Sequence, residues 1–258
     1  MVDKQFSELR LAALYDLFAP AERRRDFAFY LPLLMSAGSV LDVGCGTGAL
    51  LHRARAAGHT GRLCGLDPAA GMLEVARSGG GDIEWIHGDL ASAPVREREF
   101  DLVVMTGHAF QVLLTDDEIR GALAAIARAL TDGGVFAFET RNPLTREWED
   151  WHLRYSGEVT DAAGTVVRSE CEVVTPLTDG LLSFTHTCTS PDWDRPEISR
   201  STLRFLGAAE LSGFLAGAGL AVTGQYGDWD RSPLTPDSPE IITLARRRPP
   251  GPGTAEPG

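Results

Sequence analysis

The sequence is poor in positive charge, in cysteine and in long apolar runs. Its 258 residues carry 24 Lys and Arg against 36 Asp and Glu, a formal net charge of −12, which repels the phosphates of nucleic acids and anionic membranes. No apolar run approaches the roughly 18 residues of a membrane span, and the N-terminal MVDKQFSELR lacks the apolar core of a signal peptide. We therefore expect a cytoplasmic protein with no nucleic-acid or membrane partner.

The four cysteines give no sign of a metal site or a disulfide framework. They form no CxxC pair and have no histidine at ligand spacing; they are Cys45, Cys64, Cys171 and Cys188. Hydrophobic residues at 43% and charged residues at 23% are close to the average of folded globular domains. A chain of this length buries about 70–75% of its unfolded surface, so it needs no metal or disulfide. We expect one α/β domain with an insertion and no bound metal.

Short apolar strands alternate with helices along most of the chain. A capping box at Thr115–Glu118 opens a helix that is expected to end at Asp132-Gly133-Gly134. Near-continuous apolar strands of this kind favour a mostly parallel sheet covered on both faces. The expected strands of this main sheet are residues 39–43, 62–67, 83–87, 100–105, 135–139, 220–225 and 240–245.

Two segments depart from this alternation. Residues 7–35 place apolar side chains at three- and four-residue spacings, with a break near Pro20, which is typical of helices. Between 141 and 205 the alternation of Leu182, Phe184 and their polar neighbours indicates an antiparallel sheet, with strands at 158–160, 165–174 and 181–189. We therefore expect an N-terminal helical lid (1–35), a core (36–140 and 206–246), an antiparallel β insertion that forms a cap (141–205) and a disordered tail (247–258).

The strongest motif is VLDVGCGTG at residues 40–48. Glycines at 44, 46 and 48 allow the backbone to turn sharply and to approach a ligand where a strand passes into a helix. The same stretch satisfies a loose dinucleotide-binding pattern, with Asp67 near the place of a ribose-binding acid. An NAD(P)-dependent oxidoreductase is therefore one alternative.

Two further carboxylates count against a nucleotide pyrophosphate. Asp42 lies two residues before the first glycine, where a carboxylate suits an ammonium group rather than a phosphate. Asp89 follows the third strand in HGDL, where it can accept a hydrogen bond from an adenine amine. With Asp67, three strand ends supply acids to one edge of the sheet.

In this order the motifs VLDVGCGTG, GLDP, HGDL, FDLVV and LTDGGVFAFE resemble the class I S-adenosylmethionine (SAM)-dependent methyltransferases, over residues 36–140 and 206–246. The resemblance implies a Rossmann-like sheet of seven strands whose last strand is antiparallel, SAM as cofactor and S-adenosylhomocysteine (SAH) as product. It also implies that the glycine loop abuts the methionine part of SAM, that Asp67 binds both ribose hydroxyls and that Met72 packs on the adenine. The cofactor residues so implied are Asp42, Gly44, Gly46, Gly48, Asp67, Pro68, Met72, Gly88, Asp89, Leu90 and Thr106.

The acceptor side is indicated by scattered residues. His108, just after the fourth strand, is similar to the Gly-His step of sugar N-methyltransferases, which also have an antiparallel insertion and an N-terminal tyrosine for which Tyr15 is the candidate. A base is needed only when the acceptor must lose a proton, so His108 is either a base or an acceptor contact. Arg141 either pairs with an acceptor carboxylate or holds its loop, and Trp229 either lines the acceptor site or packs in a core.

The sequence therefore predicts a SAM-dependent methyltransferase acting on an oxygen or nitrogen of a small molecule. Natural-product or sugar-like acceptors are favoured. A SAM-binding protein without turnover, or a relative of the same fold with another reaction, is the main alternative. The oxidoreductase is the weaker one.

Overall fold

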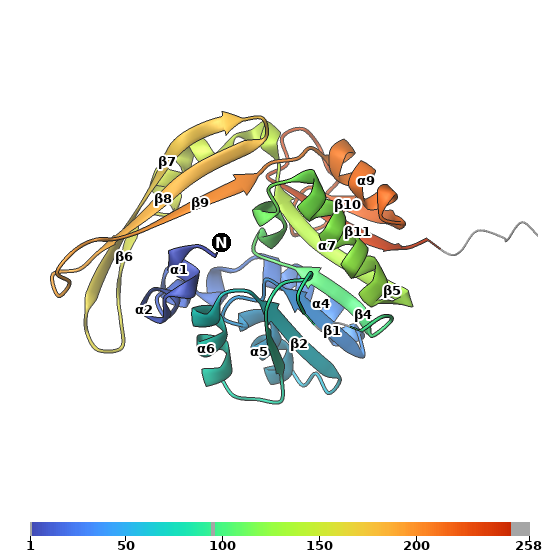
Figure 1. Cartoon of the computed structure of the whole chain (residues 1–258), viewed down its shortest axis with the longest axis horizontal. Helices are drawn as coiled ribbons and strands as arrows, with labels where there is room; N and C mark the ends of the chain where they lie inside the picture. Colours follow the sequence, from blue (N-terminus) through green and yellow to red (C-terminus); the bar gives the residue numbers. More distant parts are fainter. Residues whose placement is uncertain (1, 94–95, 249–258) are drawn as a thin grey trace, which may run out of the picture.

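The computed structural model describes residues 2–93 and 96–248. Its main sheet has seven strands in the order β10-β11-β5-β4-β1-β2-β3 (Figure 1). Strands β1 to β5 pair in parallel, and β11 is antiparallel to both of its neighbours, so the predicted Rossmann-like sheet with an antiparallel last strand is confirmed. The strands are β1 (Ser39–Val43), β2 (Arg62–Asp67), β3 (Glu84–His87), β4 (Phe100–Met105), β5 (Leu130–Arg141), β10 (Leu220–Tyr226) and β11 (Glu240–Arg247).

Helices cover both faces of this sheet because alternate residues of each strand are buried on opposite sides. In β5, Phe136 and Phe138 face the core under α7 and α9, whereas Ala137 faces the core under α4 and α5. The helices are α4 (Asp26–Ser36), α5 (Ala49–Ala56), α6 (Ala70–Ser78), α7 (Asp116–Ala129) and α9 (Ala208–Gly217), with the short turn η2 (Ala109–Val112) after β4.

The end of α7 differs from its predicted position. The capping box of Thr115 and Glu118 forms as expected, but the helix ends at Ala129 and Leu130 already pairs with Phe100 in the sheet. Gly134 lies inside β5, where a Cβ would come within 2.9 Å of the Phe100 carbonyl oxygen. This glycine therefore serves the close pairing of β4 and β5 rather than the helix end.

The insertion forms a second, antiparallel sheet in the order β6-β7-β8-β9. Three of its strands fall where they were predicted; β9 was not predicted, because its inward positions include Ser199 and Ser201, and two buried serines interrupt the apolar alternation. The strands are β6 (Gly157–Thr160), β7 (Val166–Thr178), β8 (Leu181–Thr189) and β9 (Glu197–Arg204); η3 (Pro143–Thr145), η4 (Glu147–Asp150) and α8 (Trp151–Arg154) connect them to β5.

The N-terminal segment lies between this second sheet and α6 of the core (Figure 1). On one side Leu11 packs against Val167 of β7, and on the other Ala12 packs against Met72 of α6. Both Lys4 and Arg10 form ion pairs with Glu197 of β9. The segment therefore joins the two sheets over the carboxyl edge of β1 and β2. Its helices are α1 (Lys4–Ser7), α2 (Leu9–Ala12), α3 (Tyr15–Phe18) and η1 (Ala21–Arg23).

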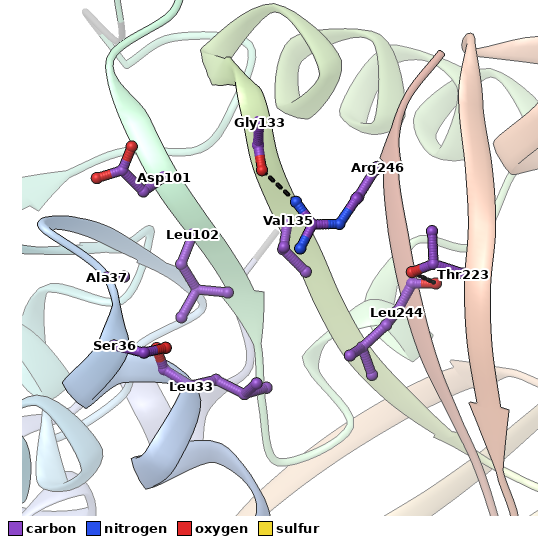
Figure 2. A pocket seen from close by; sticks show the side chains of 10 residues that line it. All are labelled: Leu33, Ser36, Ala37, Asp101, Leu102, Gly133, Val135, Thr223, Leu244 and Arg246. Atoms are coloured by element: carbon purple, nitrogen blue, oxygen red, sulfur yellow. Dashed lines mark hydrogen bonds between the residues drawn. The ribbon is translucent and has the colours of Figure 1, made fainter. Parts of the chain in front are cut away.

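A surface groove of about 270 Å³ lies at the opposite end of the main sheet (Figure 2). It is lined by Asp101 and Leu102 from the start of β4, by Gly133 and Val135 from the start of β5, and by residues of α4, β10 and β11. Since the predicted site lies at the carboxyl ends of the strands, this groove is separate from it. Among the residues described, no helix is both long enough and apolar enough to cross a membrane. Of the predicted disordered tail (247–258), residues 249–258 lie outside the described part of the chain. Its first residue, Arg247, belongs to β11.

Candidate active site

The carboxyl ends of the parallel strands bring acidic residues to one edge of the main sheet. Asp42 stands in β1, Asp67 ends β2 and Glu139 lies near the end of β5. Because β11 is antiparallel, its first residue Glu240 is opposite Arg141 at the same edge. In open α/β sheets this edge is where ligands bind.

The glycine loop after β1 has a left-handed backbone at all three glycines, with φ of 73° at Gly44, 56° at Gly46 and 73° at Gly48. A Cβ on Gly44 would lie 2.8 Å from the Cβ of Ala109, and one on Gly48 would overlap the ring of Trp85. A Cβ on Gly46, in contrast, would have no neighbour within 4 Å. The loop is thus packed closely at both ends and open in its middle, where a ligand can reach the backbone.

Asp67 holds this loop in place. Its Oδ2 accepts a hydrogen bond from the Gly46 N–H at 2.8 Å, and its Oδ1 accepts one from the Ala69 N–H at 2.7 Å. Burial raises the pKa of Asp67, and the two backbone donors oppose this rise. Each carboxylate oxygen keeps a further lone pair, so Asp67 can accept hydrogen bonds from a ligand while it supports the loop.

Asp42 is buried without a full set of hydrogen bonds. Asp42 is only 1% exposed, and its Oδ1 has no hydrogen-bond partner among residues 2–93 and 96–248. Burial raises the pKa of Asp42 to about 7, although Arg24 opposes the rise. A buried carboxylate oxygen without a donor is costly, and a cationic ligand group would relieve this cost.

The remaining predicted cofactor residues lie around this edge in different degrees of burial. Met72 is buried beside Ala12 and Tyr15. Asp89 is exposed, and its Oδ1 accepts hydrogen bonds from the backbone of Ala91 and Ser92 at 3.1 and 2.9 Å. Of the others, Thr106 is buried, Leu90 is half-buried, Pro68 is exposed and Gly88 donates its N–H to the Asp67 carbonyl at 3.0 Å.

His108 sits in a sharp turn directly after β4, next to the glycine loop. Its φ of 63° is left-handed, and its N–H donates to Glu139 Oε1 at 2.8 Å. The hydroxyl of Tyr30 donates to the other oxygen of Glu139. The ring Nε2 of His108 lies 3.0 and 3.1 Å from the two carboxylate oxygens of Glu240. The turn therefore directs His108 at a carboxylate from the far end of the chain.

Tyr15 reaches the same region from the N-terminal segment. Its ring packs edge-on against Phe6, with centroids 6.1 Å apart. Burial raises the pKa of Tyr15, and the charges of Arg24 and Arg141 oppose the rise. Arg141 also acts on the pKa of His108, so Tyr15 and His108 share a charged neighbour.

Arg141 is engaged within the protein. Its Nε lies 2.5 Å from Glu147 Oε1 in an ion pair, and its terminal nitrogens donate to Gln111 Oε1 at 3.1 Å and to the Tyr155 hydroxyl at 3.3 Å. Its guanidinium also stacks over Trp151, with 5.0 Å to the ring centroid. Of the two predicted roles, these contacts support the one in which Arg141 holds its loop.

Three tryptophans, Trp148, Trp151 and Trp229, pack against other aromatic side chains. Trp229 contacts Phe29 and Tyr30 of α4, with ring centroids 6.2 and 6.1 Å apart. Trp148 and Trp151 instead form the small core of the second sheet.

Sequence reasoning missed two acids of this site, Glu139 and Glu240. The only signal for Glu139 was a charged residue at the end of the apolar run VFAFE, and no motif marked Glu240. The side-chain partners of these two residues, Tyr30 for Glu139 and His108 for Glu240, are more than a hundred positions away along the chain.

Comparison with known proteins connects this geometry to one family. Residues 40–134 match the family described as methyltransferase domain. The malonyl-(acyl-carrier protein) O-methyltransferase of Pectobacterium atrosepticum is 30% identical over 190 residues, which cover 71% of this chain and 71% of that protein. Other curated relatives of the same name match over shorter stretches, and the chain spans about half of their length.

Solved structures share the fold. The CcbJ methyltransferase of Streptomyces caelestis superposes with a TM-score of 0.73 at 21% identity, covering 94% of this chain and 97% of that one. The sugar N-methyltransferase KedS8 of Streptoalloteichus superposes with a TM-score of 0.69 at 20% identity, covering 91% and 93%. The methyltransferase of Pectobacterium atrosepticum is 30% identical and covers 71% of this chain. Together with the family match, this relative shows that the chain belongs to the class I S-adenosylmethionine-dependent methyltransferases.

Proposed function

We propose that this protein transfers the methyl group of SAM to a nitrogen or oxygen of a small-molecule acceptor. The observation that carries the proposal is the edge of the main sheet, where the unpartnered oxygen of Asp42 and the open backbone at Gly46 adjoin the turn that holds His108. Family membership supports the methyl donor. The likeness to a sugar N-methyltransferase favours a natural-product or sugar-like acceptor.

The residues present fit SAM. The unpartnered Asp42 oxygen suits the ammonium of the methionine part, the free lone pairs of Asp67 suit the ribose hydroxyls, and the second carboxylate oxygen of Asp89 suits the adenine amine. Bound SAM supplies a methyl carbon on a positively charged sulfur, and transfer depends chiefly on aligning the acceptor with it. We place Tyr15 and His108 on the acceptor side, beneath the second sheet.

Calorimetric titration with SAH, SAM, NADH and NADPH tests the cofactor. Micromolar binding of the first two alone is expected, because Asp42 stands where a pyrophosphate would be repelled. Binding of nicotinamide nucleotides alone would contradict the proposal. SAH binding followed by a broad acceptor screen that yields no methylated product would favour the SAM-binding protein without turnover.

Asp42→Asn is expected to weaken SAH binding about 10-fold at pH 8, because the ammonium loses a charged partner, a cost of about 1.5 kcal/mol. The same change should stabilise the ligand-free protein. An ordinary aspartate ionises near 3.8, but burial raises the pKa of Asp42 to about 7 in the folded state. The folded state thus favours the neutral form, and the ionised carboxylate destabilises the fold increasingly as pH rises from about 4 to about 7.

Urea unfolding at pH 5 and pH 8 measures this effect. The loss of stability that Asp42 causes between the two pH values should be absent from the Asp42→Asn protein. Asp82→Asn, at an exposed position, is the control for a change of charge alone. Undiminished SAH affinity in Asp42→Asn would show that Asp42 does not meet the ligand.

A further inference from the structure

Glu240 and His108 form a pair that neither the family motifs nor the sequence pattern marks. We propose that Glu240 is a positioning residue, which fixes the tautomer of His108 so that its Nδ1 removes a proton from the methyl acceptor. This inference rests on the proposed function and gives His108 the role of general base.

The geometry of the pair is specific. Both carboxylate oxygens of Glu240 lie 3.0–3.1 Å from Nε2 of His108, and the two side chains keep 10% and 18% of their surface exposed. The backbone of His108 is held by its hydrogen bond to Glu139. In the part of the chain that the structure describes, Nδ1 has no hydrogen-bond partner. One ring nitrogen is therefore engaged, and the other is available to a ligand.

The position of the pair suits an acceptor. Ala109, the next residue, packs against Gly44 of the glycine loop. The charges of Arg141 and Asp26 act on the pKa of His108 and also on the pKa of Tyr15 in the N-terminal segment. His108 therefore stands between the cofactor loop and the space beneath the N-terminal segment and the second sheet.

The chemistry follows from what a carboxylate can do. An ionised carboxylate only accepts hydrogen bonds, so Nε2 must carry the ring proton and Nδ1 presents its lone pair. In the proposed step an N–H or O–H bond of the acceptor breaks, its electron pair stays on the acceptor, and the proton goes to Nδ1. As Nδ1 takes up this proton, the Nε2 proton passes along its hydrogen bond to Glu240, so the ring ends neutral with its proton on Nδ1 and Glu240 ends protonated.

The surroundings set the proton affinity of the pair. Burial raises the pKa of Glu240 to about 8, while the charge of Arg141 opposes the rise. Burial likewise lowers the pKa of His108 to about 3. The other charged and titratable groups that act on the pair come from β5, η4, α4 and the segment after β10; they are Glu139, Glu147, Asp26, Tyr30 and Asp228.

The protonation state of Glu240 decides which ring nitrogen of His108 carries the proton. Below about pH 8 Glu240 is protonated and donates to Nε2, so the ring proton sits on Nδ1. Above about pH 8 Glu240 is ionised, Nε2 carries the proton and Nδ1 is free to accept another. The ring itself stays neutral throughout. A pair that gains its proton near pH 8 is matched to an ammonium or an acidic hydroxyl as proton donor.

Nitrogen NMR of the histidine rings tests the inference in the whole protein. With wild-type protein, the His108 proton should move from Nδ1 to Nε2 as pH rises through about 8, and this change should disappear in Glu240→Gln. His108→Asn identifies the signal. His52 and His59 provide internal controls, since their Nε2 atoms face the backbone carbonyls of Ala76 and Ala37 at 2.8 and 2.9 Å; their signals should be the same in both proteins.

Two results would overturn the inference: a single His108 tautomer between pH 6 and pH 10 in the wild-type protein, or an unchanged switch in Glu240→Gln. SAH titration of the wild-type protein separates this failure from failure of the proposed function. If SAH binds and the switch is missing, only the role of Glu240 is wrong. If SAH does not bind, the proposed function itself fails.

Discussion

Asp67→Ala is expected to weaken SAH binding by about 100-fold, or about 3 kcal/mol, at the upper end of what unpaired buried hydrogen-bonding groups cost. Two losses combine. The ribose hydroxyls lose their acceptor, and the N–H groups of Gly46 and Ala69 lose the carboxylate that holds the loop. Calorimetric titration with SAH measures the effect.

The control for Asp67→Ala is Glu74→Ala, which removes an exposed acid from the neighbouring helix α6 and should leave the affinity unchanged. Asp67→Asn separates the two losses, because an amide oxygen can still accept one backbone hydrogen bond. It should bind more tightly than Asp67→Ala. Full affinity in Asp67→Ala would mean that the ligand does not occupy this edge of the sheet.

The cofactor half of the site could be predicted because its information is local. Residues 40–48 contain the strand, the turn and the start of the helix, and only glycine tolerates the left-handed backbone and close packing seen at Gly44 and Gly48. The seven strands of the main sheet were also predicted, because most of them are short apolar runs, although β5 begins five residues before its expected start.

The acceptor half depends on contacts between distant parts of the chain. His108 meets Glu240 from the start of β11, and Tyr30 of α4 meets Glu139 of β5. The first pair exists because the antiparallel β11 brings its first residue to the carboxyl edge of a parallel sheet. The second exists because α4 packs on the face of the sheet that includes β5. No local pattern encodes such a meeting, so His108 could be proposed but its partner could not.

The insertion shows a different limit. β9 buries Ser199 and Ser201 on the face where alternation predicts apolar side chains, because that face meets the N-terminal segment: Ser199 Oγ accepts a hydrogen bond from the Gln5 N–H at 3.0 Å. Ser201 hydrogen-bonds to Asp3 of the same segment. Hydrophobic alternation cannot predict a strand whose inner face carries polar side chains that bind a backbone.

Arg141→Ala is expected to lower the free energy of unfolding by about 3 kcal/mol, as measured by urea denaturation, because breaking a buried ion pair leaves Glu147 with only the exposed Arg154 as a charged partner. The side chains of Arg141 and Glu147 are only 11% and 10% exposed. The variant also loses the stacking on Trp151 that joins β5 to the core of the second sheet. Arg141→Ala combined with Glu147→Gln should regain part of the stability, since no unpaired buried charge remains.

Arg146→Ala is the matched control for this ion pair. Arg146 pairs with Glu149 at 2.5 Å in the same connection, but the two side chains are 65% and 57% exposed, so its loss should change stability by no more than about 1 kcal/mol. The comparison also decides between the two roles considered for Arg141. If Arg141 served the acceptor carboxylate, Arg141→Ala would fold as stably as Arg146→Ala and would raise only the KM for the acceptor. A loss of stability confined to Arg141→Ala would instead show that this residue holds the connection between β5 and the second sheet in place.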